Sequence, residues 1–187
     1  MPATITYHFI QAQPFFDFFQ QQRSSIFKAD FDFDIRPILS EQEKLQSQQH
    51  QQVLKNITRY FLVAKANEAI VGWSFGMQKS AEDFYMINSA VLAAYRQQGI
   101  YTQLMQHAVE FISNKGFQRI YSRHKMSNNA ILIPKLKFGF TITGFEVNDV
   151  FGNLVELSFY TNPQRRALLE IRMGTRKPNA TDLQLIQ

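Results

Sequence analysis

The most constraining feature of the sequence is a β-type run that gives way to a polar loop and then to a helical pattern, between Val91 and Ala108. The first turn of a helix exposes backbone N–H groups and carries a partial positive charge, so it suits an anion such as phosphate. The single glycine of the loop, Gly99, allows the backbone to approach a ligand, and Arg96 adds positive charge. The block therefore predicts an α/β arrangement with a phosphate cradle made of Arg96, Gln97, Gln98, Gly99, Ile100, Tyr101 and Thr102.

The composition fits one folded domain. Of the 187 residues, 45% are hydrophobic and 19% are charged, which is the range of globular proteins and leaves enough chain to bury a core. The 18 phenylalanines indicate a core, or a pocket wall, built largely from aromatic rings. We expect residues 1–162 to form a single domain and residues 163–187 to form a C-terminal extension that is either packed on it or partly loose.

Several classes of protein are excluded by what the chain lacks. The sequence contains no cysteine, which excludes disulfides, thiolate metal sites and a cysteine nucleophile. No apolar run approaches the roughly 18–20 residues of a membrane-spanning helix, and no secretory signal is visible. We therefore expect a cytoplasmic protein without a membrane partner. We also expect no metal site, because metal-ligand spacing is missing among the four histidines, His8, His50, His107 and His124.

The formal net charge of +5 admits either an anionic partner or a diffuse solvated surface. The densest basic stretch runs from Arg165 to Lys177, and no run of four basic residues occurs. We expect no nucleic-acid partner, because neither a recognition helix nor an aromatic-basic ribonucleoprotein motif is visible. A coenzyme with phosphates explains the modest positive excess equally well.

Hydrophobic periodicity and turn signals predict alternating strands and helices. A capping box at Ser40–Glu43 places a helix start at Glu41, whereas residues 24–38 have no clear period. The tail after Pro163 is predicted as one short helix and a loose end. The predicted strands are 4–10, 60–65, 69–77, 83–92, 117–122, 140–147 and 154–160, and the predicted helices follow Pro14, start at Glu41, and span 102–114 and 128–138.

A second motif supports the first. Asn128 is a good helix N-cap, and Gly139-Phe140, eleven residues on, ends the helix and returns a ring to the core. Together the two blocks resemble the GNAT superfamily of N-acetyltransferases, over roughly residues 88–147. Arg96 and Gly99 match its acetyl-coenzyme A pyrophosphate motif, Arg/Gln-x-x-Gly-x-Gly/Ala. Asn128 and Gly139-Phe140 match its second coenzyme motif.

The resemblance implies an α/β (α+β) fold with a mixed, mostly antiparallel central sheet of about six to seven strands and about four flanking helices. It implies transfer of an acetyl group from acetyl-coenzyme A to a small-molecule or peptide amine by direct attack, in a monomer or a homodimer. The strand that ends at Val91 would splay from its neighbour, and the backbone N–H near Val91 would polarise the acetyl carbonyl. Arg96 and Asn128 would be the main side-chain contacts with the coenzyme.

The sequence departs from the family pattern at two positions. Tyr101 stands where glycine or alanine is usual, and Lys135 stands where many members carry a tyrosine that protonates the coenzyme thiolate. Lys135 would stabilise the thiolate, pair with coenzyme phosphates, or be a solvated helix residue. Tyr101, Tyr121 and Tyr160 are alternative acids, so the general acid stays open.

The proton acceptor is equally open. His124 is predicted just past a strand end and is a candidate base, because imidazole titrates near neutral pH. Glu82 and Asp83 are candidate remote bases that would act through water. Asn88 and Ser89, in an otherwise apolar strand, either face a cleft or are solvated at an edge. We regard Asn88 and His124 as tentative catalytic residues beside Val91 and Lys135.

Two other hypotheses remain. The missing tyrosine motivates a non-catalytic acyl-coenzyme A-binding module, and the basic tail motivates an anionic-surface or nucleic-acid binder. The sequence does not specify the acceptor amine or whether acyl groups other than acetyl are used.

Overall fold

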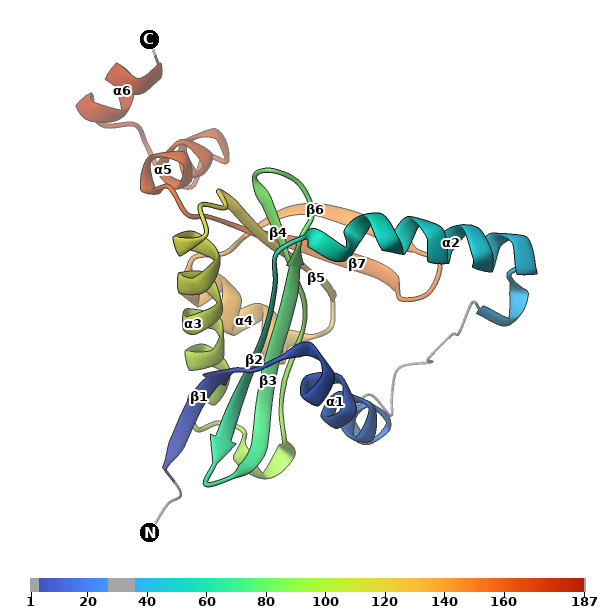
Figure 1. The fold of residues 1–187 in the computed structure, drawn as a ribbon. Coiled ribbons are helices and arrows are strands. Elements are labelled where there is room, and N and C mark those ends of the chain that lie inside the picture. The colour runs from blue at the N-terminus through green and yellow to red at the C-terminus, as the bar shows by residue number, and fades with distance from the viewer. Residues whose placement is uncertain (1–3, 27–35, 187) are drawn as a thin grey trace.

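The computed structural model describes residues 4–26 and 36–186. One seven-stranded sheet runs through it in the order β1-β2-β3-β4-β5-β7-β6, with all neighbours antiparallel except β4 and β5 (Figure 1). The expected mixed, mostly antiparallel fold is confirmed. The strands are β1 (Ile5–Phe9), β2 (Arg59–Ala66), β3 (Ala69–Gln78), β4 (Asp83–Val91), β5 (Arg119–Lys125), β6 (Thr141–Asn148) and β7 (Gly152–Tyr160). The α-helices are α1 (Ala12–Ile26), α2 (Glu41–Val53), α3 (Ile100–Asn114), α4 (Asn129–Phe138), α5 (Pro163–Arg172) and α6 (Ala180–Ile186), and the short 3₁₀ turns are η1 (Arg36–Ile38), η2 (Leu54–Asn56) and η3 (Ala93–Tyr95).

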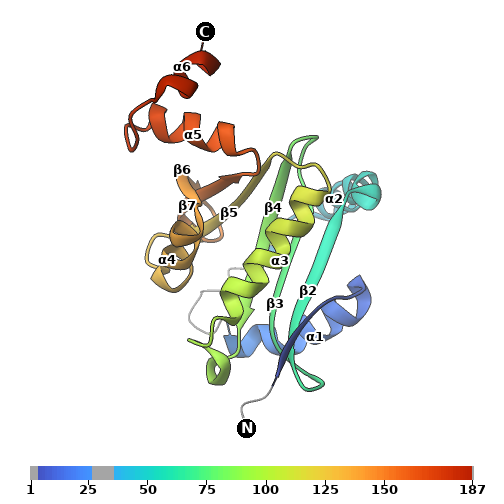
Figure 2. The same ribbon diagram turned by 90° about the vertical axis from the view of Figure 1, so that its left-hand side faces the viewer.

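Alternation of side chains along the strands divides the core into two layers. On β2, Tyr60 and Leu62 belong to the large cluster that α3 and α4 cover, whereas Phe61 and Val63 belong to a smaller cluster. α1 covers this smaller cluster on the opposite face of the sheet (Figure 2). The chain therefore has a three-layer arrangement, with helices on both faces of one sheet.

Phenylalanine rings are packed in both core clusters, and those of the α1 layer make the densest contacts. The ring of Phe15 lies 5.1 Å from the rings of both Phe61 and Phe75, and Phe18 and Phe19 pack edge-on against Trp73. Such tilted and edge-to-face pairs add to the stabilisation that burial of the rings provides. The aromatic rings form both a core and part of a pocket wall, the two alternatives that the sequence offered, because Phe19 and Phe75 also line a cavity.

The sheet changes register at the middle of β4. Phe75 pairs with Asn88, but Gly76 pairs with Met86, so Ile87 is an extra residue in a β-bulge. A side chain at Gly76 is excluded, because a Cβ there would lie 2.5 Å from the carbonyl oxygen of Tyr85. The bulge bends β4 beside the place where it leaves β5.

β4 and β5 are paired over only three residues each, Asp83–Tyr85 with Arg119–Tyr121. Beyond them, β4 continues along β3, and β5 continues along β7. The paired end is held by an ion pair between Arg119 Nε and Asp83 Oδ1 at 2.7 Å and by the rings of Tyr85 and Tyr121, 4.9 Å apart. The two strands therefore diverge from a fixed end.

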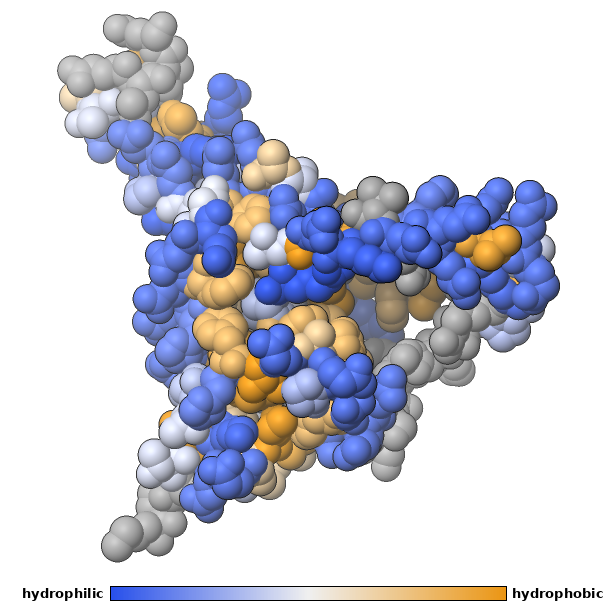
Figure 3. Space-filling view, viewed as in Figure 1, coloured by the Kyte–Doolittle hydropathy of each residue, from blue (hydrophilic) through white to orange (hydrophobic). Residues whose placement is uncertain are grey.

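α2 extends away from the sheet, and its exterior is mainly hydrophilic, whereas hydrophobic residues gather over the sheet between α2 and α1 (Figures 1 and 3). The capping box is confirmed, since Ser40 N donates to Glu43 Oε2 at 2.8 Å and Glu43 N donates to Ser40 Oγ at 3.3 Å. The segment without clear period falls mostly on residues 27–35, which lie outside the described residues. No helix in the described part of the chain is long and apolar enough to cross a membrane.

The C-terminal tail differs from the prediction of one short helix and a loose end. α5 begins at an N-cap formed by Asn162, and Arg166 Nη1 donates to the carbonyl oxygens of Tyr160 and Thr161. A second helix, α6, follows. Its start is fixed by reciprocal bonds, in which Asn179 N donates to Asp182 Oδ2 and Asp182 N donates to Asn179 Oδ1. This local capping signal was missed in the sequence.

We predict that Gly76→Ala destabilises the protein by about 1–3 kcal/mol, because the added methyl group overpacks the bulge against Tyr85. Gly144→Ala is the matched control, since the nearest atom to its added Cβ is 3.9 Å away and its φ is not in the left-handed region. Urea unfolding measures both. Equal losses in the two variants would contradict the account.

Candidate active site

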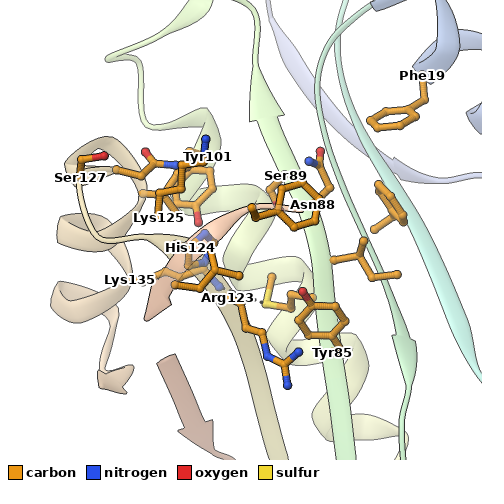
Figure 4. Close-up of a pocket in the computed structure, with 17 residues that line it drawn as sticks. Phe19, Tyr85, Asn88, Ser89, Tyr101, Arg123, His124, Lys125, Ser127 and Lys135 are labelled. Atoms are coloured by element: carbon orange, nitrogen blue, oxygen red, sulfur yellow. Dashed lines mark hydrogen bonds between the residues drawn. The ribbon is translucent and has the colours of Figure 1, made fainter. Parts of the chain in front are cut away.

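A cavity of about 620 Å³ opens where β4 and β5 diverge. Side chains from β4, β5, α1, α3 and α4 line it (Figure 4). Because alternate residues of a strand face opposite sides of the sheet, the lining has two halves. Ser89 and His124, with Tyr101 and Lys135, form the half beneath α3 and α4, whereas Phe19, Phe75, Asn88 and Arg123 form the half on the α1 side.

The backbone of β4 faces the gap. Leu92 N donates to the Val71 carbonyl at 2.9 Å, so the next pair, Val91 and Gly72, lies at a non-hydrogen-bonded position of the ladder. The N–H of Val91 is therefore directed away from β3 and toward the departing β5. The same alternation directs the N–H of Ser89 into the gap.

The polar loop follows directly. Gln97 and Gly99 have positive φ values of 62° and 77°, and α3 starts at Ile100. The first backbone bond of this helix runs from Gln103 N to Gly99 O at 3.1 Å, so the N–H groups of residues 100–102 have no acceptor within the helix. A Cβ at Gly99 would meet no atom within 4 Å. The loop thus presents donors at an open surface.

Two polar side chains border this loop. Arg96 Nε donates to the Val91 carbonyl at 3.1 Å, which ties the loop to the end of β4. Gln98 Nε2 donates to the Ala94 carbonyl at 3.3 Å. Asn128 is the N-cap residue of α4, but its side chain makes no capping hydrogen bond and lines the cavity instead.

Lys135 is buried inside the cavity and is only 1% exposed. Its Nζ donates to Met86 Sδ at 3.5 Å and lies 4.2 Å from the centre of the Phe140 ring. Gly139, with a φ of 110°, turns the chain so that Phe140 N donates to the Lys135 carbonyl. Burial lowers the pKa of Lys135 from 10.5 to about 7.

His124 lies within β5, not just past the end of a strand as predicted, because β5 pairs with β7 as far as Lys125. Its Nε2 is 2.9 Å from Ser122 Oγ. Burial, and then the charge of Lys135, lower the pKa of His124 to about 3. The imidazole is therefore neutral at physiological pH and is a weak proton acceptor.

Asn88 and Ser89 both line the cavity and both have partners in the sheet. Asn88 Oδ1 accepts a hydrogen bond from Trp73 Nε1 at 2.9 Å, which leaves its amide nitrogen as a donor. Ser89 Oγ donates to Ser74 Oγ at 2.8 Å, and Ser74 Oγ is 2.8 Å from the Tyr60 hydroxyl. Both residues are thus held in fixed orientations.

Of the three tyrosines considered as alternative acids, the structure places one in the cavity and two outside it. Tyr101 lines the cavity, and burial raises the pKa of its hydroxyl. Tyr121 and Tyr160 do not line it, and their rings lie under Arg119 and Arg165, 4.9 Å from each guanidinium carbon. Of the three tyrosines, Tyr101 alone is brought to Lys135.

The candidate carboxylate bases lie at the closed end of the β4–β5 pair, outside the cavity lining. Asp83 is paired with Arg119, whose hydrogen bond lowers the pKa of that carboxyl. Glu82 is exposed and lies 3.5 Å from Arg165 Nη1. In the described part of the chain, no group of three or more histidine, aspartate or glutamate side chains is arranged to hold a metal ion.

Arg123 was missed in the sequence. It lines the cavity and is held by Glu146 at 2.9 Å and Glu156 at 3.4 Å, and its guanidinium lies over the rings of Tyr85 and Tyr121. The sequence signal that could have found Arg123 is its place next to His124 in a strand, where neighbouring side chains face opposite sides of the sheet. Its two acidic partners are more than twenty residues away and join it only through the sheet.

We predict that Lys135→Met stabilises the protein most at pH 6, with a gain that shrinks above pH 7. Between pH 7 and 10.5 the unfolded chain keeps a proton on Lys135 that the folded chain has lost, so the stability of the wild type rises there relative to the variant, by at most about 1.4 kcal/mol per pH unit. The neighbouring His124 titrates below this window, and Tyr101 above it. Urea unfolding at pH 6, 8 and 9.5 measures the difference, and a pH-independent difference would contradict the assignment.

Comparison with known proteins gives the family. The Acetyltransferase (GNAT) family model matches residues 21–140. A search of curated protein sequences finds no match. Many solved structures match the fold.

Three of these structures illustrate the similarity. An N-acetyltransferase from Staphylococcus aureus is 15% identical, with a TM-score of 0.62 over 86% of this chain and 100% of that chain. A GNAT family acetyltransferase from Elizabethkingia anophelis with acetyl-CoA bound is 19% identical, with a TM-score of 0.56 over 83% and 97%. The IAA acetyltransferase from Bacillus cereus is 18% identical, with a TM-score of 0.58 over 84% and 99%.

At such identities the structures show the fold alone, whereas the family match covers more than half of the chain. The cosubstrate of this family is acetyl-coenzyme A, and its acceptors are amines. The chain belongs to the GNAT family of acetyltransferases and is an acyltransferase.

Proposed function

We propose that this acetyltransferase moves the acetyl group of acetyl-coenzyme A to a small-molecule or peptide amine by direct attack, without an acyl-enzyme. The divergence of β4 from β5 carries the proposal, because it joins a row of backbone donors to a cavity that reaches both faces of the sheet. One half can hold the acyl end of the coenzyme and the other the acceptor. The sequence also contains no cysteine, so a cysteine thiol cannot carry the acetyl group as an acyl-enzyme.

The residues at the site fit the coenzyme. A pyrophosphate would find three suitable features at the loop: the N–H groups of residues 100–102, the open space at Gly99 and the charge of Arg96. Tyr101, which lines the cavity, carries a buried hydroxyl without a partner. The residues that we assign to coenzyme binding are Val91, Arg96, Gln97, Gln98, Gly99, Ile100, Tyr101, Thr102, Asn128 and Lys135.

When bound, acetyl-coenzyme A supplies an acetyl group activated as a thioester. The N–H of Val91, directed into the gap, is our candidate donor to the acyl oxygen. The amide nitrogen of Asn88 is a second donor, on the acceptor side. Arg123, fixed by two carboxylates, borders the same half of the cavity.

Lys135 is our candidate for the group that supplies the proton to the leaving thiolate. Its burial against Met86 and Phe140 argues against pairing with phosphates at the exposed loop and against a solvated role. A pKa of about 7 lets its ammonium give up a proton near neutral pH, close to the value of about 8.5 of a free thiol. His124, neutral and adjacent, is assigned to the cavity wall and not to proton removal.

The binding-module alternative is motivated by Lys135 in the place of a tyrosine. The anionic-surface alternative is weakened by the contacts of the basic tail. Arg165 donates to Gln118 Oε1 at 2.6 Å, Arg166 holds the end of β7, and Arg176 forms two bonds to Asp182.

The domain division rests on the same tail contacts. We propose residues 1–162 as the acyltransferase domain and residues 163–187 as an extension whose α5 is packed on it. Arg166 donates to the carbonyl oxygen of Tyr160 at the end of β7, and Arg165 donates to Gln118, just before β5. A cytoplasmic location and the oligomeric state stay predictions.

The function is tested by incubating the protein with acetyl-coenzyme A and a panel of amines and measuring thiol release. Amine-dependent release with formation of the acetylated amine is expected. Saturable binding of acetyl-coenzyme A without release on any amine would support the binding module instead.

We predict that Gly99→Ala weakens acetyl-coenzyme A binding at least about tenfold, because its methyl group occupies the open space of the cradle. Gly174→Ala is the matched control, since Gly174 has a similar φ of 73° and equally open surroundings away from the loop. Both variants should lose about 1 kcal/mol of stability from the left-handed conformation. Calorimetry measures the binding, and equal affinities in the two variants would remove the cradle assignment.

We predict that Lys135→Met lowers kcat about 100-fold with little change in acetyl-coenzyme A affinity. In the wild type, kcat should fall as the pH rises above about 7, because Lys135 loses the proton that it supplies. This decrease of kcat with pH should be absent in the variant. Lys137→Met, at an exposed position of the same helix, is the control. If kcat of Lys135→Met still fell above pH 7, Lys135 would be ruled out as the acid.

A further inference from the structure

Tyr101 carries a buried polar atom that the fold leaves without a partner. Within the described residues, its hydroxyl is the buried side-chain nitrogen or oxygen for which no hydrogen bond exists. Such groups are rare in folded proteins, because their desolvation is uncompensated. An unpaired buried donor that faces a cavity indicates a ligand atom that completes it.

The position of the Tyr101 hydroxyl indicates which part of a bound coenzyme it would contact. The ring extends from the first turn of α3 into the cavity, and its hydroxyl is directed toward the part that His124 and Lys135 line (Figure 4). Its backbone lies in the first turn of α3, beside the exposed loop, whereas its hydroxyl is buried. The backbone of this turn would therefore meet the phosphates, and the hydroxyl would meet a part of the coenzyme that lies deeper in the cavity.

The other hydroxyls nearby already have partners. Tyr60, Ser74 and Ser89 form a chain with oxygen separations of 2.8 Å. Lys135 Nζ donates to Met86 Sδ. No hydrogen bond links Tyr101 to these described groups, so its donor is available to a ligand.

We propose that the Tyr101 hydroxyl donates a hydrogen bond to the coenzyme sulfur and is thereby a catalytic residue that stabilises the leaving thiolate. This inference rests on the proposed function. It assigns a role to the side chain that replaces the small residue of the family motif, and it is separate from the backbone contact of Tyr101 with the phosphates.

The phenol donates a hydrogen bond and keeps its proton. Burial raises the pKa of Tyr101 above the ordinary value of a phenol and far above the value of about 8.5 of a thiol, so transfer to the thiolate is unfavourable. When the carbon–sulfur bond breaks, its electron pair passes to sulfur. The proton that sulfur then takes comes from Lys135 Nζ, while the O–H bond of Tyr101 stays intact.

The test compares binding of coenzyme A and of desulfo-coenzyme A, which lacks the thiol, to the wild type and to Tyr101→Phe. Calorimetry is done at pH 9, where the thiol is largely ionised and Lys135, with a pKa of about 7, is largely neutral. The wild type should bind coenzyme A about tenfold or more tightly than the desulfo form, the range of a hydrogen bond to a charged group. Tyr101→Phe should lose most of this preference and keep its affinity for the desulfo form.

Tyr160→Phe is the control, because Tyr160 lies outside the cavity and should keep the wild-type preference. The proposal is overturned if the wild type shows no preference, a result that needs no variant to fold. An equal loss for both ligands in Tyr101→Phe, or no loss, would also overturn it. If Tyr101→Ala bound both ligands more tightly, the ring would be an obstruction and not a donor.

Failure of the proposed function has a different signature. Amine-dependent thiol release would then be absent. If the wild type also binds neither coenzyme form at any concentration tested, the Tyr101 proposal falls with the proposed function. Binding of both forms without a preference leaves the coenzyme site intact and rejects the role of the Tyr101 hydroxyl alone.

Discussion

The separation of β4 from β5 after three paired residues is the constraint on which the rest of the structure depends. Each strand keeps a partner on its other side, β3 or β7, so the sheet stays continuous at one end and open at the other. Arg119 and Asp83 close the paired end, and the bulge at Ile87 bends β4 just beyond it. Backbone groups left without a strand partner must be satisfied otherwise, and a bound ligand or water is the remaining means.

The same opening determines the electrostatics of the cavity. α4 delivers Lys135 into a buried position, where burial lowers its pKa, and the Lys135 charge in turn helps to keep His124 neutral. The Gly139-Phe140 signature has a specific part here, because the turn at Gly139 places the Phe140 ring over Lys135 Nζ. The motif therefore shapes the chemistry of the cavity as well as the end of the helix.

Local signals in the sequence were sufficient for most of the fold. Capping at Ser40, the glycine that precedes α3 and the glycine that ends α4 are short-range features, and the structure has helix ends at each. The environment of Lys135 was not predictable, because α4 has hydrophobic residues on more than one side and its burial depends on packing against β4 and β5. The ion pairs of Arg123 likewise join β5 to β6 and β7, and the extension of β5 through His124 depends on pairing with β7.

The central claim is that acetyl-coenzyme A binds along the open edge of β4 and the first turn of α3. Backbone amide hydrogen exchange, measured residue by residue with and without acetyl-coenzyme A, tests it most directly. The account predicts new protection at Ser89 and Val91 and at the three amides of residues 100–102, with the paired amides of β2 and β3 unchanged. Binding of acetyl-coenzyme A that leaves those five amides exchanging as before would contradict it.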